Sequence, residues 1–385
     1  QYADNLSYLK RRCAMEVPTG KRVSMFELFY DLVFAYMIAQ ATDLIHHLHH
    51  GVLSSTTLLI FVFVIVVFIN SWMVQSVFTN RYGESSWIDI GFTFVDMMIL
   101  LYMSNAFAAT LNTDLHPFFI AAGLLSLTLL LQYVIVFIRT REPVDRRIAA
   151  DFAAILLLRT VTLLVAGILP LRYGLPLALV GILVSWIAPA FTGHHTRQHP
   201  IIFSHLLERL TLLTIITFGE AIVGIATFFT KIELSWTSVC VFMIIAALFF
   251  IYIVQFDHLI ETKRTGETGN LLIYLHYPII FGLSLVTVSL HFIADAEANL
   301  NFAVTALYIG IGLLLFGTWV AKHYNQAAFL NHNHMGVWFT LTTLIGYALS
   351  LWFDAFPEIV TTTAIMTVIA CSYTVYYHFH AQNNS

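Results

Sequence analysis

The chain alternates between long apolar segments and short polar ones. A helix that crosses a bilayer needs about 20 mostly apolar residues, because about 30 Å of hydrocarbon is crossed at about 1.5 Å per residue. Twelve segments fit this description, and the spans they predict are residues 24–46, 52–76, 86–110, 117–138, 148–169, 173–191, 203–229, 235–257, 270–293, 299–321, 335–353 and 357–378. The pattern predicts an all-α polytopic membrane protein with about twelve transmembrane helices.

Polar features recur at matching places in the two halves. Glu27 stands at the start of the first predicted helix and Glu208 at the start of the seventh. Because six spans return the chain to the same side, two such blocks would be repeats of one topology. The predicted organisation is an N-terminal arm (1–23), a first six-helix repeat (24–191), a linker (192–202), a second six-helix repeat (203–378) and a tail (379–385).

Basic residues are unevenly shared between the two sides of the predicted topology. Fourteen of the 18 Lys and Arg residues fall in segments on the side of the N-terminus, whereas only Arg172 and Lys231 fall on the other side. Positive residues near the ends of spans are retained in the cytoplasm. We therefore expect the arm, the linker, the tail and both termini to lie in the cytoplasm.

Composition narrows the class of protein further. Hydrophobic residues make up 59% of the chain and charged residues 10%, against about 45–50% and about 25% in soluble domains, which argues against a soluble enzyme. A net charge of -4 without a long basic tract argues against nucleic-acid binding. No nucleophile–base pair, phosphate-binding glycine loop or haem motif is recognisable. We therefore expect no enzymatic activity and no cofactor.

Two acids lie one turn apart at the start of the first predicted helix. Glu27 and Asp31 are separated by four residues and so share a helix face. Like charges this close favour the retention of one proton or one cation. The alternative is a structural acid pair that is neutralised by Lys21, by Arg22 or by a group on another helix.

Asp96 lies well inside the third predicted span, between apolar residues. A charge at this depth needs a partner or a wet cavity. The chief candidate is Arg159, the deepest basic residue in the chain. We expect a buried Asp96–Arg159 ion pair, of a kind that transporters also break during their cycle.

The seventh predicted helix carries polar residues at every third position. The series runs Glu208, Thr211, Thr214, Thr217 and Glu220. It predicts either a path lined by oxygen atoms for a cation or for protons, or a helix-packing seam of threonines.

The histidines are the remaining candidate sites. His276 lies two residues before Pro278, which leaves a backbone carbonyl free one turn earlier, so His276 is a candidate proton or ion station or a packing residue. A second group is placed at the outer end of the first predicted helix, where it forms a weak candidate metal site or a solvated cluster. Its members are His46, His47, His49 and His50.

Two segments of the chain resemble the bacterial low temperature requirement A family, and shorter matches follow in the same order. The two segments are residues 26–35 (FELFYDLVFA) and 208–220 (ERLTLLTIITFGE), and the shorter matches are residues 79–82 (TNRY), 256–257 (FD) and 274–278 (YLHYP). His258 stands where that pattern has Arg. The resemblance implies a polytopic inner or plasma membrane protein. Residues 29–35 (FYDLVFA) are also similar to the first helix of lysosomal and bacterial potassium channels built from two six-helix repeats, although the second half lacks an equivalent Phe-x-Asp.

These features favour a transporter or channel for a small ion or solute. Its candidate ion- or proton-binding residues are Glu27, Asp31, Asp96, Glu208, Thr217, Glu220 and His276. The alternative is an intramembrane sensor or enzyme that binds a lipid head group or a metal. Glu208 and Glu220 are 12 residues apart, about 18 Å along a helix, and such a spread through the bilayer favours passage over a site at one depth. The expected partners are the lipid bilayer and the small ion or solute. A second copy of the chain, in a homodimer, is the one protein partner that we include as an alternative to a monomer.

Overall fold

The structure is a computed structural model that describes residues 21–110, 115–229, 235–329 and 334–383. Within these ranges the chain forms helices and no β-strand, which confirms the all-α class. The long helices are α2 (Met25–Leu44), α3 (Ser55–Tyr82), α4 (Trp87–Thr110), α5 (His116–Arg139), α6 (Pro143–Ala166), α7 (Leu171–Ile187), α9 (Phe203–Ile225), α10 (Trp236–Ile253), α11 (Asn270–Ala294), α12 (Leu300–Val320), α13 (His334–Ser350) and α14 (Phe356–Asn383). Short helical segments are η1 (Ala188–Ala190), α8 (Gly193–Thr196), η2 (Ala226–Phe229), η3 (Val254–Leu259), η4 (Ala321–Tyr324) and η5 (Ala327–Phe329).

Nine helices of the described chain are long and apolar enough to cross a bilayer. They are α3 to α6, α9 to α12 and α14, with α9, α10 and α12 extended by the short helices that follow them. Helix α7 is apolar but shorter. An integral membrane protein is therefore supported, and the twelve-span, two-repeat arrangement stays a prediction.

Several helices begin at side chains that satisfy their first backbone N–H groups. The hydroxyl of Ser24 accepts a hydrogen bond from the backbone N–H of Glu27 at 3.3 Å, and the Glu27 carboxylate accepts one from the Ser24 N–H at 2.9 Å. This reciprocal capping box fixes the start of α2. Single caps of the same kind start α3 at Ser54, α10 at Ser235 and α12 at Asn299.

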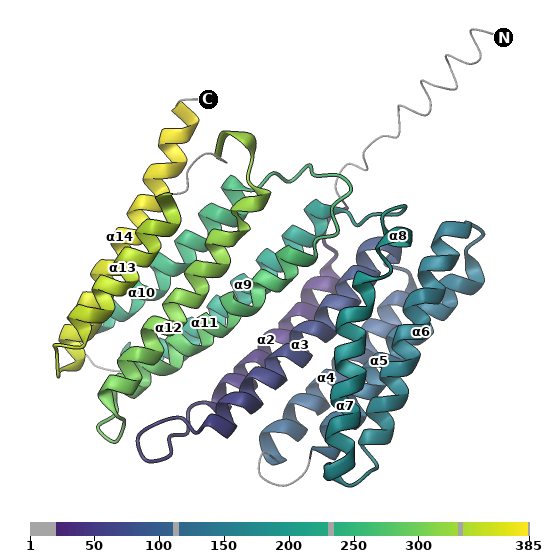
Figure 1. Ribbon diagram of the computed structural model, residues 1–385, viewed down its shortest axis with the longest axis horizontal. Coiled ribbons are helices and arrows are strands. Elements are labelled where there is room, and N and C mark those ends of the chain that lie inside the picture. Colours follow the sequence, from purple (N-terminus) through teal and green to yellow (C-terminus); the bar gives the residue numbers. More distant parts are fainter. Residues whose placement is uncertain (1–20, 111–114, 230–234, 330–333, 384–385) are drawn as a thin grey trace.

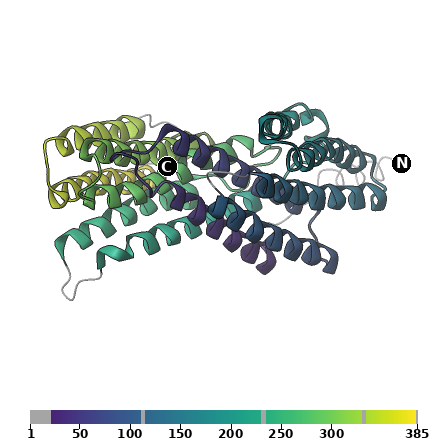
Figure 2. The same cartoon turned by 90° about the horizontal axis from the view of Figure 1, so that it is seen from below.

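Helices α2 and α3 lie in the middle of the molecule (Figure 1). Helices α4 to α7 lie on one side of them and α9 to α14 on the other. We call α2 to α7 the first helix group and α9 to α14 the second. The view from below shows the two groups meeting along α2 and α3 (Figure 2). The contact between the groups is made mainly by α2 and α3, each of which packs against α9 and α11. A site formed by residues of both groups must therefore lie along these helices.

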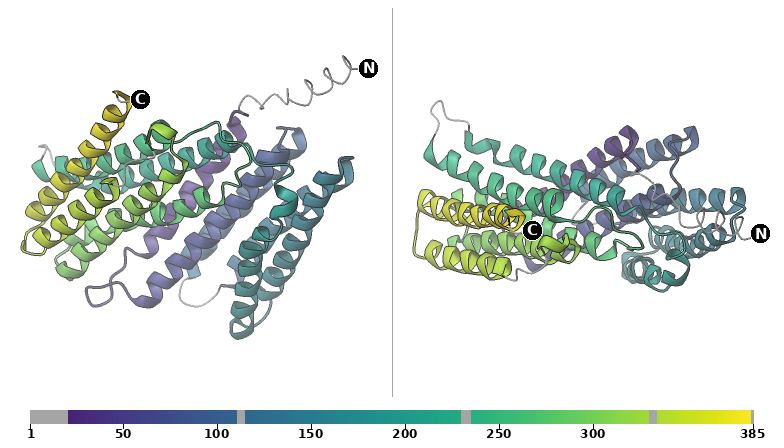
Figure 3. Two further views of the ribbon diagram at one scale, coloured as in Figure 1. Left: turned by 45° about the horizontal axis from the view of Figure 1, so that its top comes forward. Right: turned by 90° about the horizontal axis from the view of Figure 1, so that it is seen from above.

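The two groups share part of their order of neighbours. In the first, α2 packs against α3 and α4, α3 against α5, and α4 to α7 pack in succession. In the second, α9 packs against α10 and α11, α10 against α12, and α11 to α14 pack in succession. Helix α10 also packs closely against α14, and α3 makes no comparable contact with α7 within the described ranges. The views in Figure 3 show the two groups side by side.

Two loops from different groups are joined at the lower end of the bundle in Figure 1. The backbone N–H of Asn299 donates to the carbonyl of Gly51 at 2.8 Å. Gly51 has φ +79°, and a Cβ there would lie 3.0 Å from the Asn299 nitrogen. Glycine is therefore required both for the backbone conformation and for the close approach.

Helices α11 and α12 approach each other through two glycines. A Cβ on Gly310 would lie 2.8 Å from the carbonyl oxygen of Gly282 and 2.9 Å from the backbone nitrogen of Val286. These neighbours are backbone atoms, which cannot move aside as a side chain can. Small residues at such a crossing let helices pack closely where the solvent is lipid.

Gly310→Ala is expected to destabilise the protein by about 1–3 kcal/mol, because the added methyl group forces the two helices apart. The measurement is thermal unfolding of the purified protein in detergent. Gly312 is the matched control on the same helix, since its Cβ would meet only Thr343 at 3.9 Å. Gly312→Ala should leave the melting temperature unchanged or raise it. Equal losses from both substitutions would refute the close-packing argument.

Candidate functional site

The contact between α2 and α9 carries charged side chains at one end and an open pocket at the other. Helix α2 contributes Glu27 and Asp31, and α9 contributes His205 and Arg209. All four are buried. Groups of this kind are costly at membrane depth unless they are paired, so their partners define the site.

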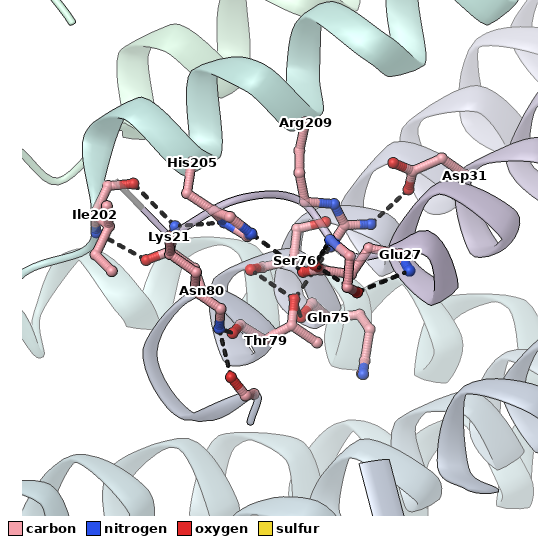
Figure 4. A network of polar contacts seen from close by, with 12 residues as sticks. Lys21, Glu27, Asp31, Gln75, Ser76, Thr79, Asn80, Ile202, His205 and Arg209 are labelled. Carbon is pink, nitrogen blue, oxygen red and sulfur yellow. Dashed lines mark hydrogen bonds and ion pairs between the residues drawn. The ribbon is translucent and has the colours of Figure 1, made fainter. Parts of the chain in front are cut away.

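Arg209 is the centre of the charged end (Figure 4). Its Nη2 lies 2.5 Å from Oδ1 of Asp31, and its Nη1 donates to the hydroxyl of Thr79 at 3.1 Å. The indole N–H of Trp72 donates to the same Asp31 oxygen at 2.7 Å, and the guanidinium lies 5.2 Å from the centre of the Trp72 ring. Asp31 and Arg209 are 0% and 1% exposed, so this is an ion pair without solvent screening.

Glu27 joins the same cluster through its second oxygen (Figure 4). While Oε2 caps α2, Oε1 lies 3.6 Å from Nη1 of Arg209 and 3.4 Å from Nε2 of His205. The other ring nitrogen of His205 lies 3.1 Å from Nδ2 of Asn80 on α3. The Asn80 amide also bonds the backbone N–H and carbonyl of Ile202. The start of α9 is thus fastened to α2 and to the end of α3.

Lys21 closes the cluster on the side where the chain enters α2. Its ammonium donates to the carbonyl oxygens of Thr79 and Gly83, which lie at the end of α3. A cation at this position complements the negative end of a helix. Burial lowers the pKa of Lys21, and the nearby Glu27 carboxylate partly opposes that shift.

The structure thus favours one of the two alternatives for Glu27 and Asp31. The two acids are neutralised by a group on another helix, because α9 brings Arg209 against both. A role for them in binding a proton or a cation stays a prediction.

The opposite end of the same contact holds a pocket of about 580 Å³ between α2, α9 and α11. Three carboxylates line it, those of Asp43, Glu220 and Asp295, together with the imidazoles of His46 and His291. No Lys or Arg is among the lining residues, and none of the three acids forms an ion pair within the described ranges. The pocket therefore has an excess of negative charge.

His46 does not cancel that charge. Burial is the main cause that lowers the pKa of His46, and the neighbouring His291 lowers it further, with ring centres 5.5 Å apart. Below its ordinary value near 6.5, the pKa of His46 leaves this imidazole neutral at pH 7.

The polar series on α9 does not share one face. Glu220 and Thr217 line the pocket, whereas Glu208 is exposed on the surface. Thr214 and Thr217 are buried, and their hydroxyls donate to the carbonyls of Leu210 and Leu213, each at 2.9 Å. The hydroxyls of these two threonines are bound by their own helix, and of the series only Thr217 and Glu220 line the pocket.

The expected direct ion pair between Asp96 and Arg159 is absent from the described chain, and this corrects the prediction. Asp96 accepts a hydrogen bond from the hydroxyl of Thr128 at 2.5 Å. Arg159 donates to Asn70 at 2.9 Å and to Ser71 at 3.0 Å, both on α3. The reason is that α5 packs between α4 and α6. Both charged side chains nevertheless line one small cavity.

The two predicted histidine sites lie in different parts of the structure. His276 is fully buried, with Nε2 3.0 Å from the Tyr252 hydroxyl and Nδ1 2.7 Å from the carbonyl oxygen of Leu272. It therefore has partners on both sides, as expected for a packing residue. Of the outer group only His46 reaches the pocket, and its other members are His47, His49 and His50. Across the described residues no three His, Cys, Asp or Glu side chains converge as a metal site.

Several residues of the site were not predicted from the sequence. Ser24 is one of them, although the spacing Ser-x-x-Glu could have revealed its capping box with the predicted Glu27. Trp72 and His205 carry no such signal, because their roles depend on which helices meet. Asp43 and Asp295 end α2 and follow α11, so only the pairing of those ends shows that they share a pocket.

Breaking the Asp31–Arg209 pair is expected to cost about 3–5 kcal/mol, because one buried charge is left without its partner. Asp31→Asn and Arg209→Gln should each destabilise the protein strongly in thermal unfolding. The double variant should lose less than the sum of the two. The matched control is Glu267→Gln, which breaks a partly exposed pair with Arg264 at 3.1 Å and should cost about 1 kcal/mol or less. Additive losses in the double variant would contradict a direct pair.

The chain was compared with protein families, with curated proteins and with solved structures. No curated protein and no solved structure matches it. The family model described as "Bacterial low temperature requirement A protein (LtrA)" matches residues 22–371, a range that includes the Asp31–Arg209 ion pair and the acidic pocket. The chain therefore belongs to the bacterial low temperature requirement A family.

Proposed function

We propose that this protein is a transporter or channel that moves a small cation, or a proton, across the plasma membrane. The observation that carries the proposal is the pocket between α2, α9 and α11, in which three carboxylates face about 580 Å³ of space with no Lys or Arg among the described residues that line it. A concave surface with one sign of charge concentrates ions of the opposite sign. A cation or proton is the species that this lining favours.

The depth of the pocket supports passage through the contact between the halves. Its lining extends from Thr227 in η2 inward along α9 to Thr217, and from His46 just after α2 inward along that helix to Ile38. From Thr217 to Arg209 is eight residues along α9, about 12 Å of helix. In this proposal, the side chains packed over that distance close the path. The Asp31–Arg209 ion pair closes it further at the end opposite the pocket.

In this proposal Glu220 is the inner carboxylate of the cation site and Arg209 is part of the closed end. Glu27 and Asp31 hold Arg209 in place and would release it when the closed end opens. The charge on Arg209 would also repel a cation from the closed end until that change occurs. Asp96 and His276 lie outside this path in the present arrangement and are not assigned to it.

The proposal includes the topology expected from the sequence. The two groups of helices would be six-span repeats of one topology, as the part of their packing order that they share suggests. Both termini would be cytoplasmic, and the pocket would open to the outside. No enzymatic step is included, and neither nucleic acid nor a second type of protein is required.

Flux into reconstituted vesicles tests the cation site. Purified protein is placed in liposomes, and uptake is measured for protons and for a panel of monovalent cations and anions. Glu220→Gln should lower cation or proton flux by about tenfold or more, because it removes a charge-assisted contact from the pocket. Glu208→Gln is the matched control, since it changes the same charge on the same helix at an exposed position.

Two results would contradict the proposal. Wild-type flux from folded Glu220→Gln protein would remove the acidic pocket from the path. Flux of anions alone would reverse the assigned charge of the substrate.

Cysteine labelling of intact cells tests the topology. His49 and Arg146 are both exposed and lie in loops or helix starts at opposite ends of the bundle. A cysteine at position 49 should react with a membrane-impermeant reagent, and a cysteine at position 146 should react only after the cells are opened. The reverse pattern would invert the orientation, and reaction at both positions would reject the expected topology.

A further inference from the structure

The linker, residues 192–202, is the covalent connection between the two helix groups, because it joins α7 to α9 by way of α8. Two of its histidines contact acids of α6. Nδ1 of His195 lies 2.6 Å from Oδ2 of Asp151, and Nδ1 of His199 lies 2.5 Å from Oδ1 of Asp145. The linker is therefore held against the first helix group at two points, which we call the linker contacts.

The linker contacts limit how far the start of α9 can move. Only residues 200–202 separate His199 from the first residue of α9, and an extended chain spans at most about 3.3–3.6 Å per residue. With His199 released from α6, the free segment would grow to residues 196–202. The linker contacts thus add to the bonds between Asn80 and Ile202 that fasten the start of α9, the helix that carries Arg209.

Both linker contacts are open to protons from the solvent. The side chains of His195 and His199 are 34% and 41% exposed, and those of their partners Asp151 and Asp145 are 32% and 20% exposed. Histidine is the side chain whose charge changes between about pH 5 and 8. The linker histidines differ in this respect from His205 of the charged cluster, which is 0% exposed.

Carboxylates face both imidazoles. On α8, His195 has Asp151 on one side and His194 on its own helix, with the two rings 5.8 Å apart. His199 borders a pocket of about 490 Å³ formed by the ends of α3, α4, α5 and α6. The other titratable residues that line this pocket are Arg81, Tyr82, Glu84, Asp89, Arg139 and Asp145. Three carboxylates against two guanidiniums leave one negative charge, which a proton on His199 balances.

We propose that the linker is a pH-sensitive latch: protonated His195 and His199 hold it on α6 and keep the closed end shut, and loss of their protons releases it. The inference rests on the proposed function, because it concerns the opening of the end at Arg209. An imidazolium beside a carboxylate gains a Coulomb attraction that a neutral ring lacks. The latch is therefore strongest at low pH and weakens as the pH rises through the range of histidine. With the linker in the cytoplasm, an alkaline cytoplasm would favour passage.

The first test measures the position of the linker and needs no flux. Full-length protein in lipid nanodiscs, with the native cysteines replaced, carries spin labels at positions 147 on α6 and 197 in the linker, both exposed. Electron paramagnetic resonance measures the distance between the labels at about pH 5.5 and at about pH 8. We expect one short distance at the lower pH and a longer or broader distribution at the higher pH.

His195→Gln combined with His199→Gln keeps a hydrogen-bonding group at both positions but removes the charge. This double variant should show the high-pH distance distribution at both pH values. His194→Gln is the matched control and should behave as the wild type. His194 is an exposed histidine of the same short helix and has no carboxylate partner within the described ranges.

The second test measures cation flux in liposomes that have the same pH on both sides. At the lower pH, flux through the double variant should exceed wild-type flux by about threefold or more, as expected from the loss of two partly exposed ion pairs. At the higher pH the two fluxes should agree. Comparison at one pH removes the contributions of Glu220 and His205, which are present in both proteins.

Each outcome decides the proposal. A label distance that does not depend on pH, or that depends on it equally in the double variant, overturns the latch. A linker that moves as expected, while the double variant and the wild type have equal flux at both pH values, overturns its control of the closed end. If the wild type carries no flux at all, the proposed function fails, and the label distances still decide whether the linker responds to pH.

Discussion

The ion pair between Asp31 and Arg209 is the constraint on which the arrangement of the two helix groups depends. Each charge alone would cost a few kcal/mol inside a membrane, about 2.5–3.5 kcal/mol on insertion scales. Paired, the two charges neutralise each other. The Trp72 indole donates a further hydrogen bond to Asp31, and the Thr79 hydroxyl accepts one from Arg209. Because Asp31 belongs to α2 and Arg209 to α9, neither group of helices can bury its own charge without the other. The pairing of the groups is therefore a requirement of their electrostatics as well as of their apolar packing.

The same contact assigns different roles to acids that look alike in the sequence. Glu27 and Asp31 lie beside a guanidinium, whereas Glu220 faces a pocket without one. Distance along the helices separates the two environments, so one end of the contact is held closed by opposite charges while the other end collects negative charge. This division is what makes a directional path for cations chemically reasonable.

The helices could be predicted from the sequence, because long apolar runs and Ser or Asn caps are local signals. Pairings between helices could not, since Asp31 and Arg209 are 178 residues apart in the chain. The proposed Asp96–Arg159 pair failed for this reason: spacing shows that both are deep, but not that α5 lies between their helices. Helix geometry alone could have separated Glu208 from Glu220. A step of three residues advances by about 300°, so four steps leave the two acids about 120° apart around the helix.

The hydrogen bond from Asn299 to Gly51 ties the two helix groups together beside the mouth of the acidic pocket, near Asp295. A backbone bond at a glycine with φ +79° leaves little freedom for the two loops to slide past each other. Relative rotation of the groups must either break this bond or use it as a pivot. With the pivot at the mouth, the displacement grows with distance from it and is largest at the far end, where Arg209 lies. If the groups rotated about this hydrogen bond, a small rotation would separate the residues of the charged cluster, while the entrance of the pocket would keep its width.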